Sequence, residues 1–191
     1  PEKAQLYLGR ARDQVPEYAR TYYYLAQAFR RSGDHRATLY NYRLAYKKNP
    51  FDPSALVELG NFYLEQKSGE RAYDYFRQVQ KGWPGNSDAK IGLARLELDN
   101  RNLYMAREIL YSIETEDVSG KAREDYNRLL HYYLAIIAVD LRDYAEAVRQ
   151  FDKLLAHPGD PFFLEVPIMS IQRRRDIAFR LAEAEGSVLQ E

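Results

Sequence analysis

The chain of 191 residues contains no cysteine, one tryptophan and two methionines. Without cysteine it forms neither a disulfide nor a thiolate nucleophile, although this absence says little about its compartment. Lysine plus arginine and aspartate plus glutamate each number 28, so the net charge gives no reason to expect nucleic acid as a partner. No apolar run approaches the 18 residues typical of a membrane-spanning helix, and we predict no direct membrane insertion.

Groups that carry catalysis or bind metals are also scarce. The three histidines, His35, His131 and His157, have no second histidine or cysteine at ligand spacing. Gly120-Lys121 lacks the upstream glycine and the following serine or threonine of a phosphate-binding loop. Adjacent acids such as Glu116-Asp117 are typical of solvated surface. We therefore predict no catalytic residue, no metal site and no cofactor, and hence no enzyme activity within these residues.

What the sequence does contain is an internal repeat. Pro16, Pro50 and Pro84 stand 34 residues apart, and a pattern of large and small apolar residues recurs between them. Each half of a unit is about a dozen residues long with apolar spacing near 3.6, which predicts two helices per unit. In the two clearest units the recurring places are Tyr22, Leu25, Ala26, Phe29, Thr38, Tyr42 and Ala45, then Leu56, Leu59, Gly60, Tyr63, Ala72, Phe76 and Val79.

The length and residue order of this unit resemble the tetratricopeptide repeat. The resemblance covers nearly the whole chain, although the third unit departs from the pattern at Lys90 and Glu97. The fourth unit is displaced by seven extra residues and departs at His131 and Ala138. The resemblance implies an all-α fold, a right-handed α-α superhelix of stacked helix pairs closed by a C-terminal capping helix.

The period and the turn residues predict ten helices and six segments. The helices are expected at about 2–14, 17–31, 35–48, 53–66, 70–81, 87–99, 103–113, 120–141, 144–156 and 166–185. Residues 1–16 match the second half of a unit, so we expect a truncated repeat and a fragment of a longer protein. The expected repeats are 17–52, 53–86, 87–119 and 120–159, followed by a linker and capping helix over 160–191.

Two stretches interrupt the repeat. Residues 114–120 are acidic and small, and they insert about two helical turns. Residues 157–167 contain three prolines and the apolar run 162–164. The helix that follows has one apolar face, which favours a cap over the last repeat and leaves a docking helix for another subunit as the alternative. That face comprises Ile171, Ile177, Ala178, Leu181 and Ala182.

Seventeen tyrosines are unusual for this length. Many occupy core places of the repeat, as Tyr22, Tyr42, Tyr63 and Tyr144 do, whereas others lie one or two places beyond the core on first helices. Tyrosine at such places favours recognition because it gives a large contact area with a polar end. For Tyr132, Tyr133 and Ile136 we expect burial under the closing helix instead.

The resemblance also implies a binding surface, because first helices line the concave face of such solenoids. Places that alternate with the core then point into a groove, and Val57, Leu64 and Ile91 are among them. A groove that changes from basic and aromatic, through acidic, to apolar suits an extended or helical peptide. The predicted contact residues are Arg20, Tyr23, Tyr24, Gln27, Arg30, Arg31, Glu58, Asn61, Glu65 and Arg95.

The favoured function is a non-catalytic scaffold that binds a protein or peptide partner, with self-association through exposed repeat ends as a further expectation. Two alternatives stay open. The chain is a targeting module of an enzyme whose catalytic domain lies elsewhere, or a groove in which tyrosines stack on a carbohydrate polymer. Binding of a partner's C-terminal carboxylate, known in one branch of the family, is not expected, because the matching places hold Tyr23, Gln27, Glu58, Asp88 and Gly92.

Overall fold

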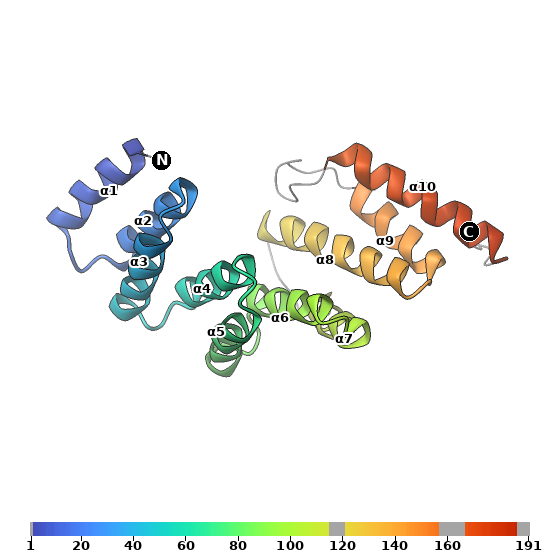
Figure 1. The fold of residues 1–191 in the computed structure, drawn as a ribbon, viewed down its shortest axis with the longest axis horizontal. Helices are drawn as coiled ribbons and strands as arrows, with labels where there is room; N and C mark the ends of the chain where they lie inside the picture. Colours follow the sequence, from blue (N-terminus) through green and yellow to red (C-terminus); the bar gives the residue numbers. More distant parts are fainter. Residues whose placement is uncertain (1, 115–120, 157–166, 187–191) are drawn as a thin grey trace. The chain divides into compact units, whose positions relative to one another are not determined.

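Residues 2–114, 121–156 and 167–186 of a computed structural model are described, and they form ten α-helices and no strand (Figure 1). The predicted all-α class is confirmed, and every helix begins and ends within two residues of its predicted bounds. The helices are α1 (Glu2–Gln14), α2 (Ala19–Ser32), α3 (His35–Lys48), α4 (Ser54–Glu65), α5 (Gly69–Gly82), α6 (Ser87–Asp99), α7 (Leu103–Glu114), α8 (Lys121–Asp140), α9 (Tyr144–Ala156) and α10 (Ile168–Ala184).

The chain divides into two compact units, residues 1–92 and 93–191. Within the first unit α1 packs on α2, α2 on α3, α3 on α4, and α4 on α5. Within the second unit α7 packs on α8, α8 on α9, and α9 on α10. Neighbours in sequence are therefore neighbours in space, as expected when each helix pair buries its apolar faces against the next pair.

The turns inside the helix pairs share one backbone feature. Gly33, Lys67, Arg101 and Arg142 each have positive φ, between 56° and 78°, and each ends the first helix of a pair. The first two intervals are 34 residues, and the last is seven residues longer, as the displaced fourth unit predicts. The residue after the turn caps the second helix in two pairs. Asp34 accepts a hydrogen bond from the Ala37 amide and Asp143 from the Glu146 amide.

The core of the first unit is built around fully buried aromatic residues of the second helices. Tyr42 on α3 and Phe76 on α5 are inaccessible to solvent. Gly60 on α4 and Gly92 on α6 both face the Phe76 ring, and a Cβ at either would come within 2.5 Å of it. The small residue predicted at 60 is therefore required by close helix packing. Among the tyrosines predicted in the core, Tyr22, Tyr42 and Tyr63 are buried and Tyr144 is half-buried.

In the second unit α10 covers the pair formed by α8 and α9. Ile171 and Ala178 of α10 join a buried cluster with Phe151 and Leu154, and Tyr132 and Ile136 pack against it. Arg175 fixes the helix from outside through a forked hydrogen bond to Asp152 on α9, at 2.9 and 3.4 Å. The packing therefore supports the capping role of the closing helix.

Two apolar residues of α10 were assigned wrongly from the sequence. Ile177 and Leu181 are 51 % and 39 % exposed, whereas Ile171, Ala178 and Ala182 are buried. The buried face of α10 is narrower than its apolar face because α10 packs mainly on α9. Residues 115–120 of the predicted insertion and residues 157–166 of the predicted linker lie outside the described residues. Among the described helices, none is long and apolar enough to cross a membrane.

Candidate binding groove

The predicted contact residues of the first unit lie on α2 and α4. On α2, Arg20, Tyr24 and Arg31 are exposed, whereas Tyr23, Gln27 and Arg30 are half-buried; on α4, Glu65 is exposed and Glu58 and Asn61 are half-buried. Arg95 lies on α6 in the second unit and is half-buried. The grouping of these ten residues as a binding site stays a prediction, but the structure shows how those of the first unit interact.

Three apolar places predicted to face the groove are buried instead. Val57 and Leu64 on α4 are each 4 % exposed, and Ile91 on α6 is 5 % exposed. α4 buries eight of its twelve residues because both α3 and α5 pack on it. What α4 offers to solvent on this side is polar, namely Glu58, Asn61 and Glu65.

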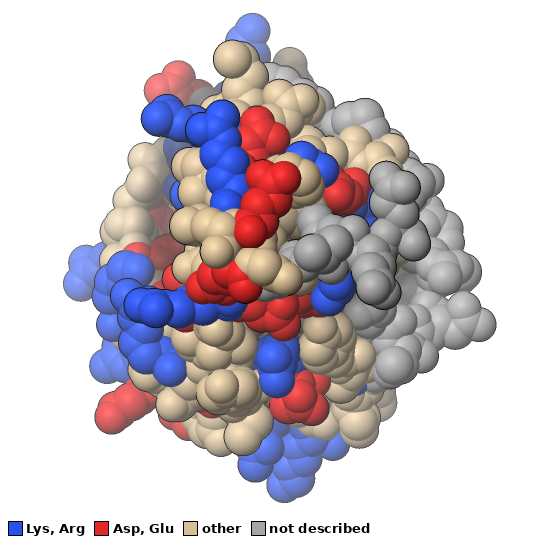
Figure 2. Space-filling model, turned by 90° about the vertical axis from the view of Figure 1, so that its right-hand side faces the viewer, with Lys and Arg blue, Asp and Glu red and all other residues tan. Residues whose placement is uncertain are grey.

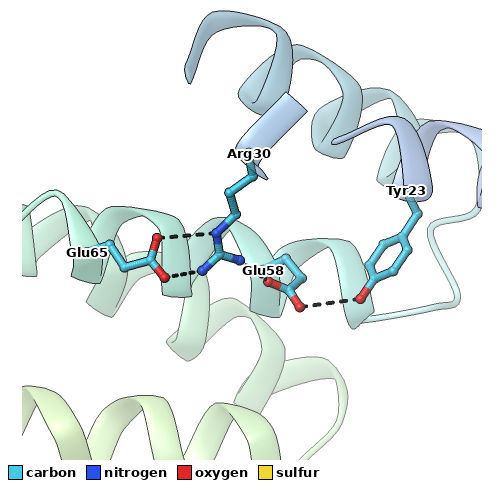
Figure 3. Close-up of polar contacts among 4 residues, drawn as sticks. All are labelled: Tyr23, Arg30, Glu58 and Glu65. Atoms are coloured by element: carbon cyan, nitrogen blue, oxygen red, sulfur yellow. Dashed lines mark hydrogen bonds and ion pairs between the residues drawn. The ribbon is translucent and has the colours of Figure 1, made fainter. Parts of the chain in front are cut away.

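Arg30 on α2 joins two carboxylates of α4 (Figure 3). Its Nη1 donates to Glu58 Oε2 at 2.7 Å, and its Nε donates to Glu65 Oε2 at 3.2 Å. Its Nη2 pairs with the other oxygen of Glu65, which completes a fork between planar groups. The cation predicted at one end of the groove thus pairs with both acids predicted at the next, and the expected change from basic to acidic is weakened here.

The hydroxyl of Tyr23 extends this network. It donates to Glu58 Oε1 at 3.4 Å, so both oxygens of Glu58 have partners (Figure 3). Burial raises the pKa of Glu58, and the nearby Arg30 opposes that rise without cancelling it. The pKa of Tyr23 is raised by its burial and then by the Glu58 charge. Burial by itself would lower the pKa of Arg30. The hydrogen bond to Glu65 and the negative charge of Glu58 outweigh burial, so the pKa of Arg30 is raised.

Two aromatic rings pack against the Tyr23 ring of this network. The Tyr23 ring meets the Tyr24 ring edge to face with centroids 5.6 Å apart, and it meets the Tyr42 ring in the same way at 5.7 Å. Tyr42 is fully buried, and its hydroxyl lies beside Arg30 without a hydrogen bond of ordinary geometry. Burial and the Glu58 charge raise the pKa of Tyr42 to about 12. The position of Tyr23 is therefore fixed on two sides.

A hollow of about 690 Å³ opens beside these residues, between the first turns of α2, the last turn of α3 and the start of α4. Arg20, Tyr23 and Tyr24 line it together with Tyr18 and Lys48. Lys48 pairs with Glu17, which also lines the hollow, at 2.6 Å. Within the described part of the chain Arg20 forms no ion pair. Its positive charge is therefore available to a bound partner.

Sequence reasoning missed the wall of this hollow formed by Glu17, Tyr18 and Lys48. These residues lie at helix ends, where the alternation of core and groove places does not apply. Asn49 and Asp52 in the connection to α4 also contribute to the wall. A weak signal was present, because charged and aromatic residues cluster on both sides of the repeat boundary at Pro50.

The histidines have packing contacts. The ring of His35 packs edge to face on Phe62 at 5.4 Å, and His131 Nδ1 donates to the Gln150 side-chain oxygen at 2.7 Å. Gln150 in turn donates to Glu146, whose pKa is lowered because hydrogen bonds from Gln150, Arg149 and Tyr111 outweigh its burial. His157 lies outside the described residues. Among the residues that are described, no three acidic or histidine side chains converge as a metal site would require.

The surface shows no large patch of one charge on the face drawn in Figure 2. Lysine and arginine side chains are interspersed there with aspartate and glutamate. This arrangement agrees with the equal numbers of basic and acidic residues in the sequence.

Comparison with known proteins adds a family match. Residues 37–87, from α3 to the start of α6, match the family model described as tetratricopeptide repeat. The matched segment contains Glu58, Asn61 and Glu65 of the predicted groove. No curated protein sequence matches the chain significantly.

Solved structures with the same fold match nearly all of the chain at low sequence identity. PilF of Pseudomonas aeruginosa is 18 % identical, with a TM-score of 0.69 over 98 % of this chain and 86 % of that one. Cut9 in the Cut9–Hcn1 hetero-tetramer of the APC/C is 14 % identical, with a TM-score of 0.73 over 95 % and 33 %. PilW, described as a type IV pilus biogenesis factor, is 13 % identical, with a TM-score of 0.63 over 93 % and 80 %. At these identities the similarity establishes the fold alone.

Proposed function

Because this chain is a tetratricopeptide repeat protein, we propose that it is a non-catalytic scaffold that binds a peptide segment of a partner protein along α2 and α4. Tetratricopeptide repeat domains generally serve as scaffolds for protein–protein interaction. The proposal adds the surface and the residues that make contact. The observation that carries it is the hollow beside Arg20, Tyr23 and Tyr24, which adjoins the Arg30 network.

The groups around the hollow supply the features of a recognition site. Tyr24 is 47 % exposed and Tyr18 is 53 % exposed, so both rings offer contact area at little cost in side-chain entropy. Arg20 offers an uncompensated guanidinium at the same rim. Tyrosine and arginine are also the residues that most often dominate interface energies. A partner would therefore gain apolar contact and a charged hydrogen bond within one small area.

The Arg30 network has a different role in this proposal. Since Arg30 is paired with Glu58 and Glu65, its removal would leave a half-buried carboxylate without its counter-ion. The network holds α2 against α4 and fixes Tyr23, so we assign Arg30, Glu58 and Glu65 to positioning of the groove. Direct contact with the partner then falls mainly to Arg20, Tyr24 and Arg31.

Site-specific photo-crosslinking in an extract of the source cells tests the proposal. A photoreactive phenylalanine analogue placed at position 24 should capture a partner. The matched control is position 40, since Tyr40 on α3 is 63 % exposed and lies outside the hollow. Mass spectrometry of the two crosslinked samples identifies proteins captured at position 24 alone.

Excess unphosphorylated peptide from the captured protein should suppress that crosslink, whereas a scrambled peptide should not. Capture at position 40 together with none at position 24 would place recognition on the second helices and contradict the proposal. Crosslinks to glycans instead of protein at position 24 would favour a carbohydrate ligand.

A further inference from the structure

A second hollow of about 480 Å³ lies on α3, α4 and α5 of the first unit, and it includes no residue of the predicted groove. Two arginines from different helices line it, Arg43 on α3 and Arg71 on α5. The other lining residues are Tyr63, Asp74, Tyr75 and Gln78. Most of these side chains are hydrogen-bond donors, and two carry a positive charge.

The arginine from α5 is held by aromatic packing. The rings of Tyr63 and Tyr75 are nearly parallel, with an interplanar angle of 9° and centroids 5.6 Å apart. The guanidinium carbon of Arg71 lies 5.5 Å from the centre of the Tyr63 ring. Tyr63 is buried and therefore fixed, so Arg71 rests on a rigid surface at the edge of the hollow.

The arginine from α3 is held by the tyrosine hydroxyls. Arg43 Nη2 donates to the Tyr63 hydroxyl at 3.4 Å. Hydrogen bonding to Tyr75 raises the pKa of Arg43 against the opposing effect of burial, and Tyr63 adds a smaller contribution to the rise. These contacts orient the guanidinium without forming an ion pair, because the partners are hydroxyl groups and not carboxylates.

The charges of the two arginines are uncompensated. In the described ranges neither Arg43 nor Arg71 forms an ion pair. Asp74 also lines the hollow, but it pairs with neither arginine within 4.0 Å. The contrast with Arg30 is direct, since that guanidinium is occupied by two carboxylates. Two guanidiniums against the single carboxylate of Asp74 leave the hollow with a net positive charge.

We propose that this hollow binds a phosphate group through Arg43 and Arg71, with the Tyr75 hydroxyl and the Gln78 amide as further donors. A phosphate monoester carries a charge of about −1.5 to −2 at neutral pH, so two guanidiniums attract it more strongly than the single Asp74 carboxylate repels it. Planar guanidiniums also bind phosphate oxygens in pairs, and donors from two helices surround a tetrahedral group better than a planar carboxylate. Inorganic phosphate and a phosphorylated side chain of another protein present the same chemistry.

Thermal unfolding in sodium phosphate and in sodium chloride of equal ionic strength tests the site. Wild-type protein should gain stability in phosphate, and the gain should saturate at millimolar concentrations. Arg43→Met and Arg71→Met should each lose the saturable part. Arg77→Met is the matched control, because Arg77 also lies on α5 and stacks on a tyrosine, Tyr73, but does not line the hollow.

Each variant is compared with itself in the two salts, so a lower baseline stability does not affect the result. The general stabilising effect of phosphate on folded proteins is shared by all four proteins and cancels. An equal phosphate response in wild type, Arg43→Met and Arg71→Met would overturn the proposal. So would a loss in Arg77→Met as large as that in Arg71→Met.

Titration calorimetry distinguishes the two sources of phosphate. A phosphoserine pentapeptide, its unphosphorylated form and inorganic phosphate are compared on wild type and Arg43→Met. Tighter binding of the phosphopeptide than of inorganic phosphate indicates a phosphorylated partner, and equal affinities indicate free phosphate. Binding of the unphosphorylated peptide as tight as that of the phosphopeptide would contradict a phosphate site.

Discussion

The ring of Phe76 on α5 lies directly against Gly60 on α4, where a Cβ atom would come within 2.5 Å of the ring carbon Cε1. Phe76 is fully buried, so its ring cannot move away without displacing other core residues. The glycine therefore sets how closely the two helices approach. This contact explains why the repeat pattern carries its smallest residue at 60.

Gly60→Ala should destabilise the protein by about 1 to 3 kcal/mol, since overpacking outweighs the gain of about 1 kcal/mol in helix propensity. Urea unfolding followed by circular dichroism measures the change. Gly9→Ala on α1 is the control, because a Cβ there meets nothing within 4 Å. It should not destabilise the protein, and equal losses in both variants would mean that the close contact is absent.

The turn inside each helix pair gives a second prediction. Gly33 has a φ of 78°, a conformation that costs other residues about 1 kcal/mol or more. Gly33→Ala should therefore lower stability by about 1 kcal/mol, although the site has open space for a methyl group. Arg101→Gly should instead raise stability, because Arg101 adopts a φ of 63° at the equivalent turn. Chemical denaturation of both variants checks the two signs, and a stabilising Gly33→Ala would contradict the turn geometry.

Removal of the Arg30 side-chain charge should make stability depend on pH. Arg30→Met leaves Glu58 half-buried without its counter-ion, at a cost of about 1 to 3 kcal/mol at pH 7. The pKa of Glu58 is already raised by burial, and loss of Arg30 should raise it further. Because the folded state then binds the proton more tightly, stability is retained at low pH and lost as pH rises through the Glu58 pKa.

Urea unfolding of wild type and Arg30→Met across pH 4 to 8 measures this dependence. The stability difference between the two proteins should be smallest at the acidic end and grow toward neutral pH. Glu58→Gln combined with Arg30→Met removes the titrating group and should abolish the pH-dependent part. A difference that is constant with pH would show that Glu58 is not held by Arg30.

The capping role of α10 is tested by one substitution at two positions. Ile171 is 2 % exposed and packs with Phe151 and Leu154, so Ile171→Ala should cost about 2 to 5 kcal/mol. Ile177 lies on the same helix but is 51 % exposed, and Ile177→Ala should cost much less. Thermal unfolding of both variants decides between a cap and a free helix. Equal small effects would indicate that α10 does not cover the second unit.

The sequence predicted those parts of the fold that depend on local periodicity. Helix bounds follow from spacing and turn residues, and the extra seven residues appear between the turns at Arg101 and Arg142. Periodicity did not show that Val57 and Leu64 are buried, because their burial depends on how α3 and α5 pack on α4. Periodicity likewise placed Ile177 and Leu181 on the apolar face of α10. The helices packed against α10 do not cover the whole of that face, and both side chains stay exposed.

The sequence predicted which positions contribute to the candidate site, but not which of their side chains interact with one another. Arg30 and Glu65 are 35 residues apart, and their pairing depends on how α2 lies against α4. The spacing of hydrophobic residues along the chain does not show how far apart α2 and α4 lie in space. The hollow at Arg43 and Arg71 was missed for a related reason, since its two arginines and its stacked tyrosines come from three helices.

The most direct test of the account is the affinity of the partner captured at position 24 for four proteins. Titration calorimetry compares wild type, Arg20→Glu, Tyr24→Ala and the control Tyr40→Ala, with unfolding curves to confirm that each variant is folded. We predict that Arg20→Glu and Tyr24→Ala each weaken binding about tenfold or more, as loss of a dominant interface residue does, while Tyr40→Ala binds like wild type. Unchanged affinity in both groove variants, with binding lost in Tyr40→Ala, would contradict the assignment of the partner to the groove.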